Sequence, residues 1–183
     1  MADLEHVLSA ARAGDEDALA DLYRSLYPRF VRYAGAVVPS SAEDVAADAW
    51  LDVARSLGRF RGDGSAFRAW AFTIVRRRVL DLRRSGARRR TDPVDPIDLI
   101  DAGDVGNVEE EAVVSLEASW AVDLITSSLS PDQAEVVLLR VLGDLSVDQV
   151  AHLLGKRPGT IRVIQHRALR RLADALRREA VTR

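Results

Sequence analysis

The sequence predicts an all-α protein of two small helical domains joined by a flexible acidic linker. Apolar residues recur at steps of three and four along most of the 183 residues, which is the spacing of one helix face. No convincing alternation of apolar and polar residues, the pattern of a half-buried strand, accompanies them. Residues 91–116 combine proline, glycine and acidic residues, and they divide the chain into domains at 1–90 and 117–183.

Four helices are predicted in residues 1–90. Their apolar stripes are Leu4, Val7, Leu8 and Ala11; Leu19, Leu22, Tyr23, Leu26 and Phe30; Val45, Ala49, Val53 and Leu57; and Phe67, Trp70, Ala71, Ile74 and Val75. Ser41, with Asp44 three residues later, is predicted to cap the third helix. The turn-rich stretch from Gly58 to Gly64 separates it from the fourth, which is expected to run through Leu82.

Charge is segregated along the chain. Residues 91–117 carry nine acidic residues and no basic one, whereas the blocks 1–90 and 118–183 have charge balances of +4 and +3 within a net charge of −2. The two prolines of the acidic segment disfavour helix, so we expect a linker with little structure of its own, with helices resuming near Glu111. Two basic blocks around an acidic connector indicate nucleic acid or another charged partner.

A helix-turn-helix unit is predicted near the C-terminus. Pro131 suits the first turn of a helix capped by Ser130. A short helix capped by Ser146 then ends at Gly155, and a second helix starts at Pro158. In such a unit the second helix enters the major groove of DNA with its N-terminal residues against base edges.

The second helix of this unit is the predicted recognition helix. Its inward stripe is expected to be Ile161, Ile164, Ala168 and Leu172. The residues expected to contact DNA are Arg157, Gly159, Thr160, Arg162, Val163, His166, Arg167 and Arg170. Arg162 and Arg167 suit guanine edges or phosphates, and the later arginines suit phosphates. The alternative is a solvated, arginine-rich amphipathic helix of a bundle.

A second candidate nucleic-acid site lies in the fourth helix. Aromatic residues stand beside a basic track there, and between positions 76 and 90 eight arginines face one acid, Asp81. Aromatic faces suit unstacked single-stranded bases, and arginines hold the backbone in a salt-sensitive way. The expected contacts are Phe67, Trp70, Arg76, Arg77, Arg78, Arg83 and Arg84. The alternatives are core packing for the aromatics and simple solubility for the arginines.

Two parts of the chain resemble one family. The run LSPDQAEVVLLRVLGDLSVDQVAHLLGKRPGTIRVIQHRALRRL, from Leu129 to Leu172, resembles domain 4 of the extracytoplasmic-function (ECF) type of sigma-70 factors. Output domains of response regulators share part of that pattern. The run SAEDVAADAWLDVARSLGRFRG, from Ser41 to Gly62, resembles sigma region 2.2, and GSAFRAWAFTIVRRRVLDLRRSGARRR, from Gly64 to Arg90, resembles regions 2.3 and 2.4.

The resemblance implies a sigma factor without an active site of its own. Residues 1–90 would be sigma domain 2, which binds core polymerase and recognises and melts the −10 element. Residues 117–183 would be sigma domain 4, which reads the −35 element. The resemblance further implies contacts with the β′ clamp and the β flap of bacterial RNA polymerase, a linker that threads the polymerase cleft, and an anti-sigma partner. The implied clamp contacts or supports are Glu43, Asp44, Asp48, Trp50 and Asp52.

Composition and motif content limit the kinds of function that this chain can have. The chain has no cysteine, and its histidines at 6, 152 and 166 form no ligand cluster, so no metal, cofactor, catalytic residue or small-molecule substrate is expected. No apolar run is long enough for a membrane helix and the first residues do not resemble a signal peptide, so we expect a cytoplasmic protein. The alternatives are a dimeric helix-turn-helix regulator, an enzyme such as a nuclease on a basic helical body, and a pure interaction adaptor.

Overall fold

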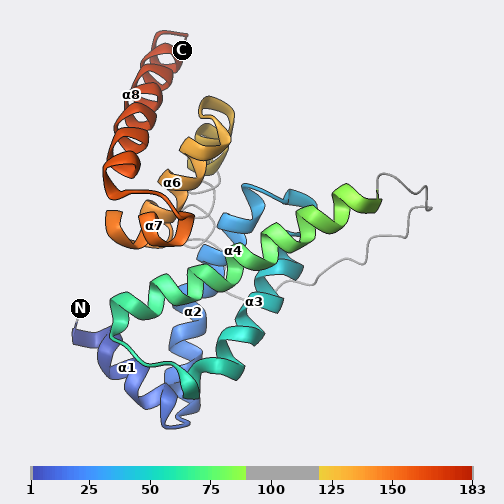
Figure 1. The fold of residues 1–183 in the computed structure, drawn as a ribbon, viewed down its shortest axis with the longest axis vertical. Helices are drawn as coiled ribbons and strands as arrows, with labels where there is room; N and C mark the ends of the chain where they lie inside the picture. Colours follow the sequence, from blue (N-terminus) through green and yellow to red (C-terminus); the bar gives the residue numbers. More distant parts are fainter. Residues whose placement is uncertain (1, 90–119, 183) are drawn as a thin grey trace.

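A computed structural model describes residues 2–89 and 120–182, which form helices and connecting turns with no strand (Figure 1). The first half contains α1 (Ala2–Arg12), α2 (Glu16–Gly35), α3 (Ala42–Ser56) and α4 (Gly64–Arg89), with the short 3-10 helices η1 (Pro39–Ser41) and η2 (Leu57–Arg59). The second half contains a helical stretch at 120–128 and then α6 (Pro131–Val141), α7 (Val147–Leu154) and α8 (Pro158–Thr182). The all-α prediction is confirmed.

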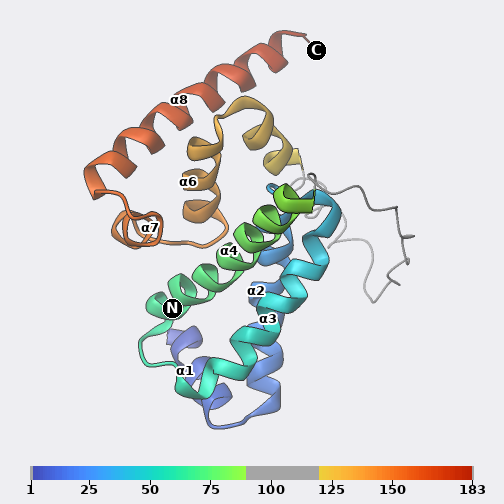
Figure 2. The ribbon, with the colours of Figure 1, turned by 45° about the vertical axis from the view of Figure 1, so that its right-hand side comes forward.

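The first half is a helical bundle in which α2 and α4 pack against α3, and α1 packs against α2 (Figures 1 and 2). The buried positions follow the predicted stripes, for example Leu22, Leu26 and Phe30 on α2. Tyr23 is an exception, because 39% of its surface is exposed. It therefore does not belong to the core stripe in which the sequence placed it.

The starts of α2 and α3 differ in their capping hydrogen bonds. Asp15 caps α2, since its Oδ1 accepts a hydrogen bond from the Ala18 amide at 2.9 Å. Ser41 is the N-cap residue of α3, as predicted, but its side chain makes no capping hydrogen bond, and the same residue closes η1. The fourth helix is also longer than predicted, because α4 starts at Gly64 and runs to Arg89.

The helix-turn-helix prediction is confirmed in its boundaries. Ser146 and Gln149 form a reciprocal capping box at the start of α7, with the Ser146 amide donating to Gln149 Oε1 at 2.8 Å and the Gln149 amide to Ser146 Oγ at 3.1 Å. Gly155 ends α7 with φ of 64°, a left-handed conformation that glycine adopts without steric cost. Pro158 then begins α8, as expected.

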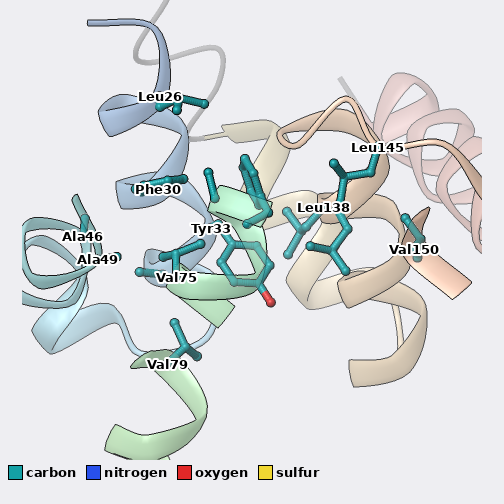
Figure 3. Close-up of a cluster of buried hydrophobic side chains, with 14 of the residues drawn as sticks. Leu26, Phe30, Tyr33, Ala46, Ala49, Val75, Val79, Leu138, Leu145 and Val150 are labelled. Atoms are coloured by element: carbon teal, nitrogen blue, oxygen red, sulfur yellow. The ribbon is translucent and has the colours of Figure 1, made fainter. Parts of the chain in front are cut away.

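The two halves share one continuous core, which the prediction of two separate domains did not include. Figure 3 shows Phe30 of α2 and Val75 of α4 in the same cluster as Leu138 of α6 and Val150 of α7. Phe72 of α4 is fully buried and meets Tyr33 of α2 edge to face at 5.9 Å between ring centroids. The bundle and the helix-turn-helix unit are therefore packed against each other in this structure.

The predicted acidic linker at 91–116 and the helix start near Glu111 fall outside the described residues. Among residues 2–89 and 120–182, no helix is both long and apolar enough to span a bilayer. The same residues contain no group of three or more histidine and acidic side chains arranged to hold a metal ion.

Candidate nucleic-acid interfaces

The start of α8 presents the surface that the sequence predicted for DNA contacts. Ile161 and Ala168 are buried, and α8 packs through this side on α6 and α7. All the predicted contact residues are exposed, namely Arg157, Gly159, Thr160, Arg162, Val163, His166, Arg167 and Arg170. Because these side chains are exposed while Ile161 packs inward, the start of α8 has the surface needed to enter a major groove.

The turn before α8 is held in place by its neighbours. The Lys156 amide donates to the carbonyl of Ala151 at 2.9 Å, which closes the end of α7. The Lys156 ammonium pairs with Asp132 in the first turn of α6 at 3.1 Å. The angle between α7 and α8 is therefore supported both by backbone hydrogen bonds and by α6.

A second basic surface follows α4 and includes a cavity. Arg77 is 83% exposed at its side chain, and Arg83 and Arg84 are exposed beyond it. A cavity of about 480 Å³ lies between α3 and α4, with Trp70 and Arg77 in its lining. Trp70 is half-buried against Phe60, at 5.0 Å between ring centroids. This combination offers an aromatic wall and exposed guanidinium groups to a flexible single strand.

An acidic and aromatic surface runs along α3, and one of its members, Asp48, lies 3.6 Å from the Arg78 guanidinium of α4. Glu43, Asp44 and Asp48 are exposed along it. Trp50 is half-buried and meets Tyr23 of α2 edge to face at 5.2 Å between ring centroids. Such a surface, with large aromatic side chains next to exposed charges, has the composition of protein-binding sites.

Family models and sequence relatives match both halves of the chain. The model of sigma-70 region 2 matches residues 22–90, and that of sigma-70 region 4 matches residues 119–172. The ECF RNA polymerase sigma factor SigD of Mycobacterium tuberculosis is 32% identical over 179 residues, covering 94% of this chain and 84% of SigD. The ECF RNA polymerase sigma factor ShbA of Streptomyces griseus is 34% identical over 168 residues, covering 87% of each chain.

The chain belongs to the ECF RNA polymerase sigma factors. Solved structures agree in fold. RpoE in complex with the anti-sigma factor NepR from Bartonella quintana matches with a TM-score of 0.61 and 23% identity, covering 86% of this chain and 96% of RpoE. CnrH in complex with the cytosolic domain of CnrY matches with a TM-score of 0.58 and 19% identity, covering 94% of this chain and 96% of CnrH.

The sigma-70 region 2 model covers α4, and one residue predicted as a DNA contact on this helix needs correction. Phe67 is fully buried, packed against Phe60 and Trp70. Its ring therefore offers no face to a DNA base, and its place in the helix stripe reflects core packing. Trp70, one turn further along α4, remains the candidate base platform.

Arg76 and Arg78 of this sigma factor are paired with carboxylates in the structure. The Arg76 Nε donates to Glu135 of α6 at 2.8 Å. The Arg78 Nε donates to Asp52 of α3 at 2.8 Å, and this hydrogen bond is the main reason that the pKa of Arg78 is raised. Neither guanidinium is therefore simply presented to DNA phosphates. Asp52, one of the predicted clamp contacts, links α3 to α4 through its pair with Arg78.

Two tyrosines that are absent from the predicted clamp contacts lie beside Trp50. Tyr23 and Tyr27 of α2 stack at 4.7 Å between ring centroids and extend the Trp50 surface. Burial is the main cause that raises the pKa of Tyr27, followed by the charges of Tyr23, Glu43 and Asp44. Their four-residue spacing on α2, with polar neighbours, was the sequence signal that they share one side of that helix.

Proposed function

We propose that this sigma factor directs bacterial core RNA polymerase to specific promoters, with α8 reading the −35 element and the α4 surface helping to open the −10 element. One observation carries the proposal: a single chain presents two exposed basic surfaces, one in each of its two sigma family regions. In this proposal RNA synthesis is carried out by the polymerase. The chain contributes only binding energy to promoter choice and strand opening.

At the −35 element, Arg162 and Arg167 are the proposed base readers. Both are exposed near the N-terminus of α8, and arginine makes two parallel hydrogen bonds to the O6 and N7 of guanine. Arg157 and Arg170 flank them and are proposed to hold phosphates. Gly159 carries no side chain, which allows close approach of the helix start to the DNA backbone.

At the −10 element, Trp70 and Arg77 are the proposed contacts of the opened strand. A base that leaves the duplex needs a stacking partner to offset the lost stacking energy, and Trp70 lines a cavity beside exposed arginines. Arg83 and Arg84 continue the basic surface along α4. Their role is electrostatic, and binding through them should weaken as salt is added.

The polymerase clamp is the proposed partner of the α2–α3 surface. Glu43, Asp44 and Asp48 supply exposed negative charge, and Tyr23 and Trp50 supply the large side chains that dominate binding energy at interfaces. Charges at the rim of an interface mainly set the association rate, whereas buried aromatics set the lifetime. Both contributions are available on this surface.

The second half of the chain has its own apolar candidate surface. Leu169 and Leu176 lie seven residues apart on one side of α8, and they are 51% and 42% exposed. We propose that this ridge contacts the β flap of the polymerase. We also propose control by an anti-sigma factor, the kind of partner with which RpoE of similar fold was solved. With polymerase and chromosome as partners, the proposed location is the cytoplasm.

Run-off transcription tests the proposed function. Purified bacterial core polymerase and genomic DNA from the source organism are incubated with and without the chain, and RNA 5′ ends are sequenced. We expect discrete start sites that depend on the chain and share a paired upstream motif. Absence of such starts, together with no binding to core polymerase, would contradict the proposal and favour a regulator that binds DNA alone.

A further inference from the structure

One side of α8 points away from the helices on which it packs. Ile161 and Ala168 are fully buried where α8 meets α6 and α7. Successive side chains of an α-helix point about 100° apart, so Val163, two residues after Ile161, points roughly 160° away from it. Val163 therefore lies near the middle of the outward side of α8, which is the side proposed to face the −35 element.

Val163 is an apolar residue on a surface that is otherwise polar or lacks a side chain. It is 49% exposed. The residues that share its side of the helix at steps of three and four are also exposed, namely Gly159, His166 and Arg167. Leu169, another exposed apolar residue of α8, lies six residues further and so about 120° around the helix. Val163 is therefore separate from the leucine ridge proposed for the β flap.

The methyl group of thymine is the apolar feature that base edges present in the major groove. Guanine, adenine and cytosine present only hydrogen-bond donors and acceptors there, whereas thymine adds a C5-methyl group beside its O4 acceptor. The side chain of Val163 can neither donate nor accept a hydrogen bond, so its favourable contact with a base is with that methyl group. A valine in a helix also keeps one preferred rotamer, so the contact costs little side-chain freedom.

Gly159 gives α8 the room to bring a short side chain to a base edge. It precedes Val163 by four residues, so it lies one turn earlier on the same side of the helix. Among the described residues, a Cβ added to Gly159 would meet nothing within 4 Å outside its own stretch of helix. Packing therefore does not require glycine here, and glycine in a helix costs stability relative to alanine. The open space is available to DNA instead.

A single exposed valine is common on protein surfaces and by itself indicates no function. Two further observations favour a base contact for Val163. It lies between Arg162 and Arg167, the two proposed base readers, and the open space at Gly159 is on the same side of α8.

We propose that Val163 selects a thymine in the −35 element by packing on its C5-methyl group, and that Gly159 lets α8 approach the base edge closely enough for this contact. The inference rests on the proposed function and adds a second kind of base recognition to it. Arg162 and Arg167 select guanine through hydrogen bonds, whereas Val163 selects thymine through an apolar contact. A duplex that keeps every hydrogen bond but lacks the methyl group is therefore the discriminating ligand.

A selection from random DNA locates the base that Val163 reads. Promoter-length duplexes with a randomised upstream half are incubated with the full-length chain, with and without core polymerase, and the bound duplexes are sequenced. We expect the wild-type holoenzyme to enrich thymine at one fixed position, and Val163→Ser to lose that preference alone. Val141→Ser is the matched control, because it makes the same change at a valine of α6 that is 64% exposed. Enrichment of the same thymine by Val163→Ser would overturn the inference.

Deoxyuridine in place of the selected thymine tests the methyl group alone. Uracil still pairs with adenine and keeps the O4 acceptor. We expect the wild-type holoenzyme to bind the uracil duplex about fourfold more weakly, the factor that corresponds to burial of one methyl group, and Val163→Ser to bind both duplexes equally. Deoxyuridine at a thymine outside the selected positions is the control. Equal binding of both duplexes by the wild-type holoenzyme would refute the methyl contact.

Gly159→Ala tests the close approach of α8. Alanine is the better helix former and has free space at this position, so the variant should unfold at no lower temperature than the wild type. We expect its holoenzyme to bind the selected duplex about tenfold more weakly, because the added methyl group lies between the helix and the DNA. Thermal unfolding and fluorescence anisotropy measure the two effects. A variant that binds as tightly as the wild type would contradict the role of Gly159.

The parallel selections separate this inference from the proposed function. A motif enriched by the chain alone, without any binding to core polymerase, would refute the promoter proposal, and the uracil comparison on that motif would still decide the role of Val163. A polymerase-dependent motif without a preferred thymine would support the promoter proposal and overturn the inference. If neither preparation enriches a motif, both are refuted.

Discussion

Three consecutive arginines of α4 have three different surroundings. Arg76 pairs with Glu135 of α6, Arg77 is exposed, and Arg78 pairs with Asp52 of α3. The reason is geometric, because successive side chains on an α-helix point about 100° apart. The three residues are identical in sequence, but each meets a different carboxylate: Arg77 makes only a long, exposed ion pair with Asp81 at 3.8 Å, and its side chain is 83% exposed.

Arg162→Ala should weaken promoter discrimination. Arg162 is exposed at the start of α8. A bidentate contact to guanine contributes about 1–3 kcal/mol of discrimination against the wrong base, and the alanine variant should lose this discrimination. Competition between matched and mismatched −35 duplexes on the holoenzyme measures this discrimination. Arg24→Ala on α2 is the control for a change of charge far from α8. Unchanged discrimination in the Arg162 variant would remove it from the readers of the element.

Phe67→Ala should mainly lower stability, whereas Trp70→Ala should mainly weaken DNA binding. Phe67 is fully buried, so its truncation should lower the free energy of unfolding by about 3–5 kcal/mol. Trp70→Ala should instead weaken binding to a single-stranded −10 oligonucleotide by about 1–3 kcal/mol. Urea unfolding and fluorescence anisotropy measure the two effects. A Phe67 variant that folds normally but binds the oligonucleotide poorly would reinstate Phe67 as a base contact.

At the scale of elements, local sequence signals were reliable where the hydrogen bonds are local. Ser146, Gln149 and Gly155 set the limits of α7 through contacts within a few residues, and the sequence contained all of these groups. Ser41 stands at the N-cap position of α3, but it also ends η1, and its φ of −136° and ψ of 21° differ from the extended backbone that aims a capping side chain at the helix. A capping pattern therefore needs the correct backbone conformation as well as the correct residue.

Ser146→Ala should destabilise the protein by about 1 kcal/mol, because the amide of Gln149 loses its acceptor at the start of α7. Ser41→Ala is the natural control, since the Ser41 side chain makes no capping hydrogen bond, and it should change stability much less. Thermal and chemical unfolding of both variants measure the difference. Equal losses for the two serines would contradict the capping assignment.

At the scale of the whole molecule, the charged surfaces of the helical bundle adjoin each other. The acidic and aromatic surface of α2 and α3 meets the arginine surface of α4 at Arg78, which pairs with both Asp48 and Asp52. A further side of α4, which includes Ser65 and Arg76, is covered by α6 and α7 of the second half of the chain. One bundle therefore has room for polymerase, for single-stranded DNA and for the second half of its own chain.

Reversal of Asp44 and Asp48 to arginine should lower affinity for core polymerase by about tenfold or more, mainly by slowing association, because both carboxylates are exposed on the proposed clamp surface. Surface plasmon resonance with immobilised core polymerase at two salt concentrations measures both rates. Reversal of Asp17 and Asp21 on α2 makes the same change in net charge elsewhere. If the two variants bind equally well, the α3 surface is not the clamp contact.

The sequence by itself determined the helical class, most helix limits, the helix-turn-helix unit and the family. These depend on periodicity, on caps and on motif order, all of which are local properties of the chain. Only the tertiary structure decided that Phe67 is core, that Arg76 and Arg78 are paired, and that Tyr23 joins Trp50. It also decided that the two halves share one apolar core and that Glu135 of α6 accepts a hydrogen bond from Arg76 of α4. The physical reason is that burial and ion pairing depend on residues up to about a hundred positions apart, such as Tyr33 and Glu135 with a separation of 102.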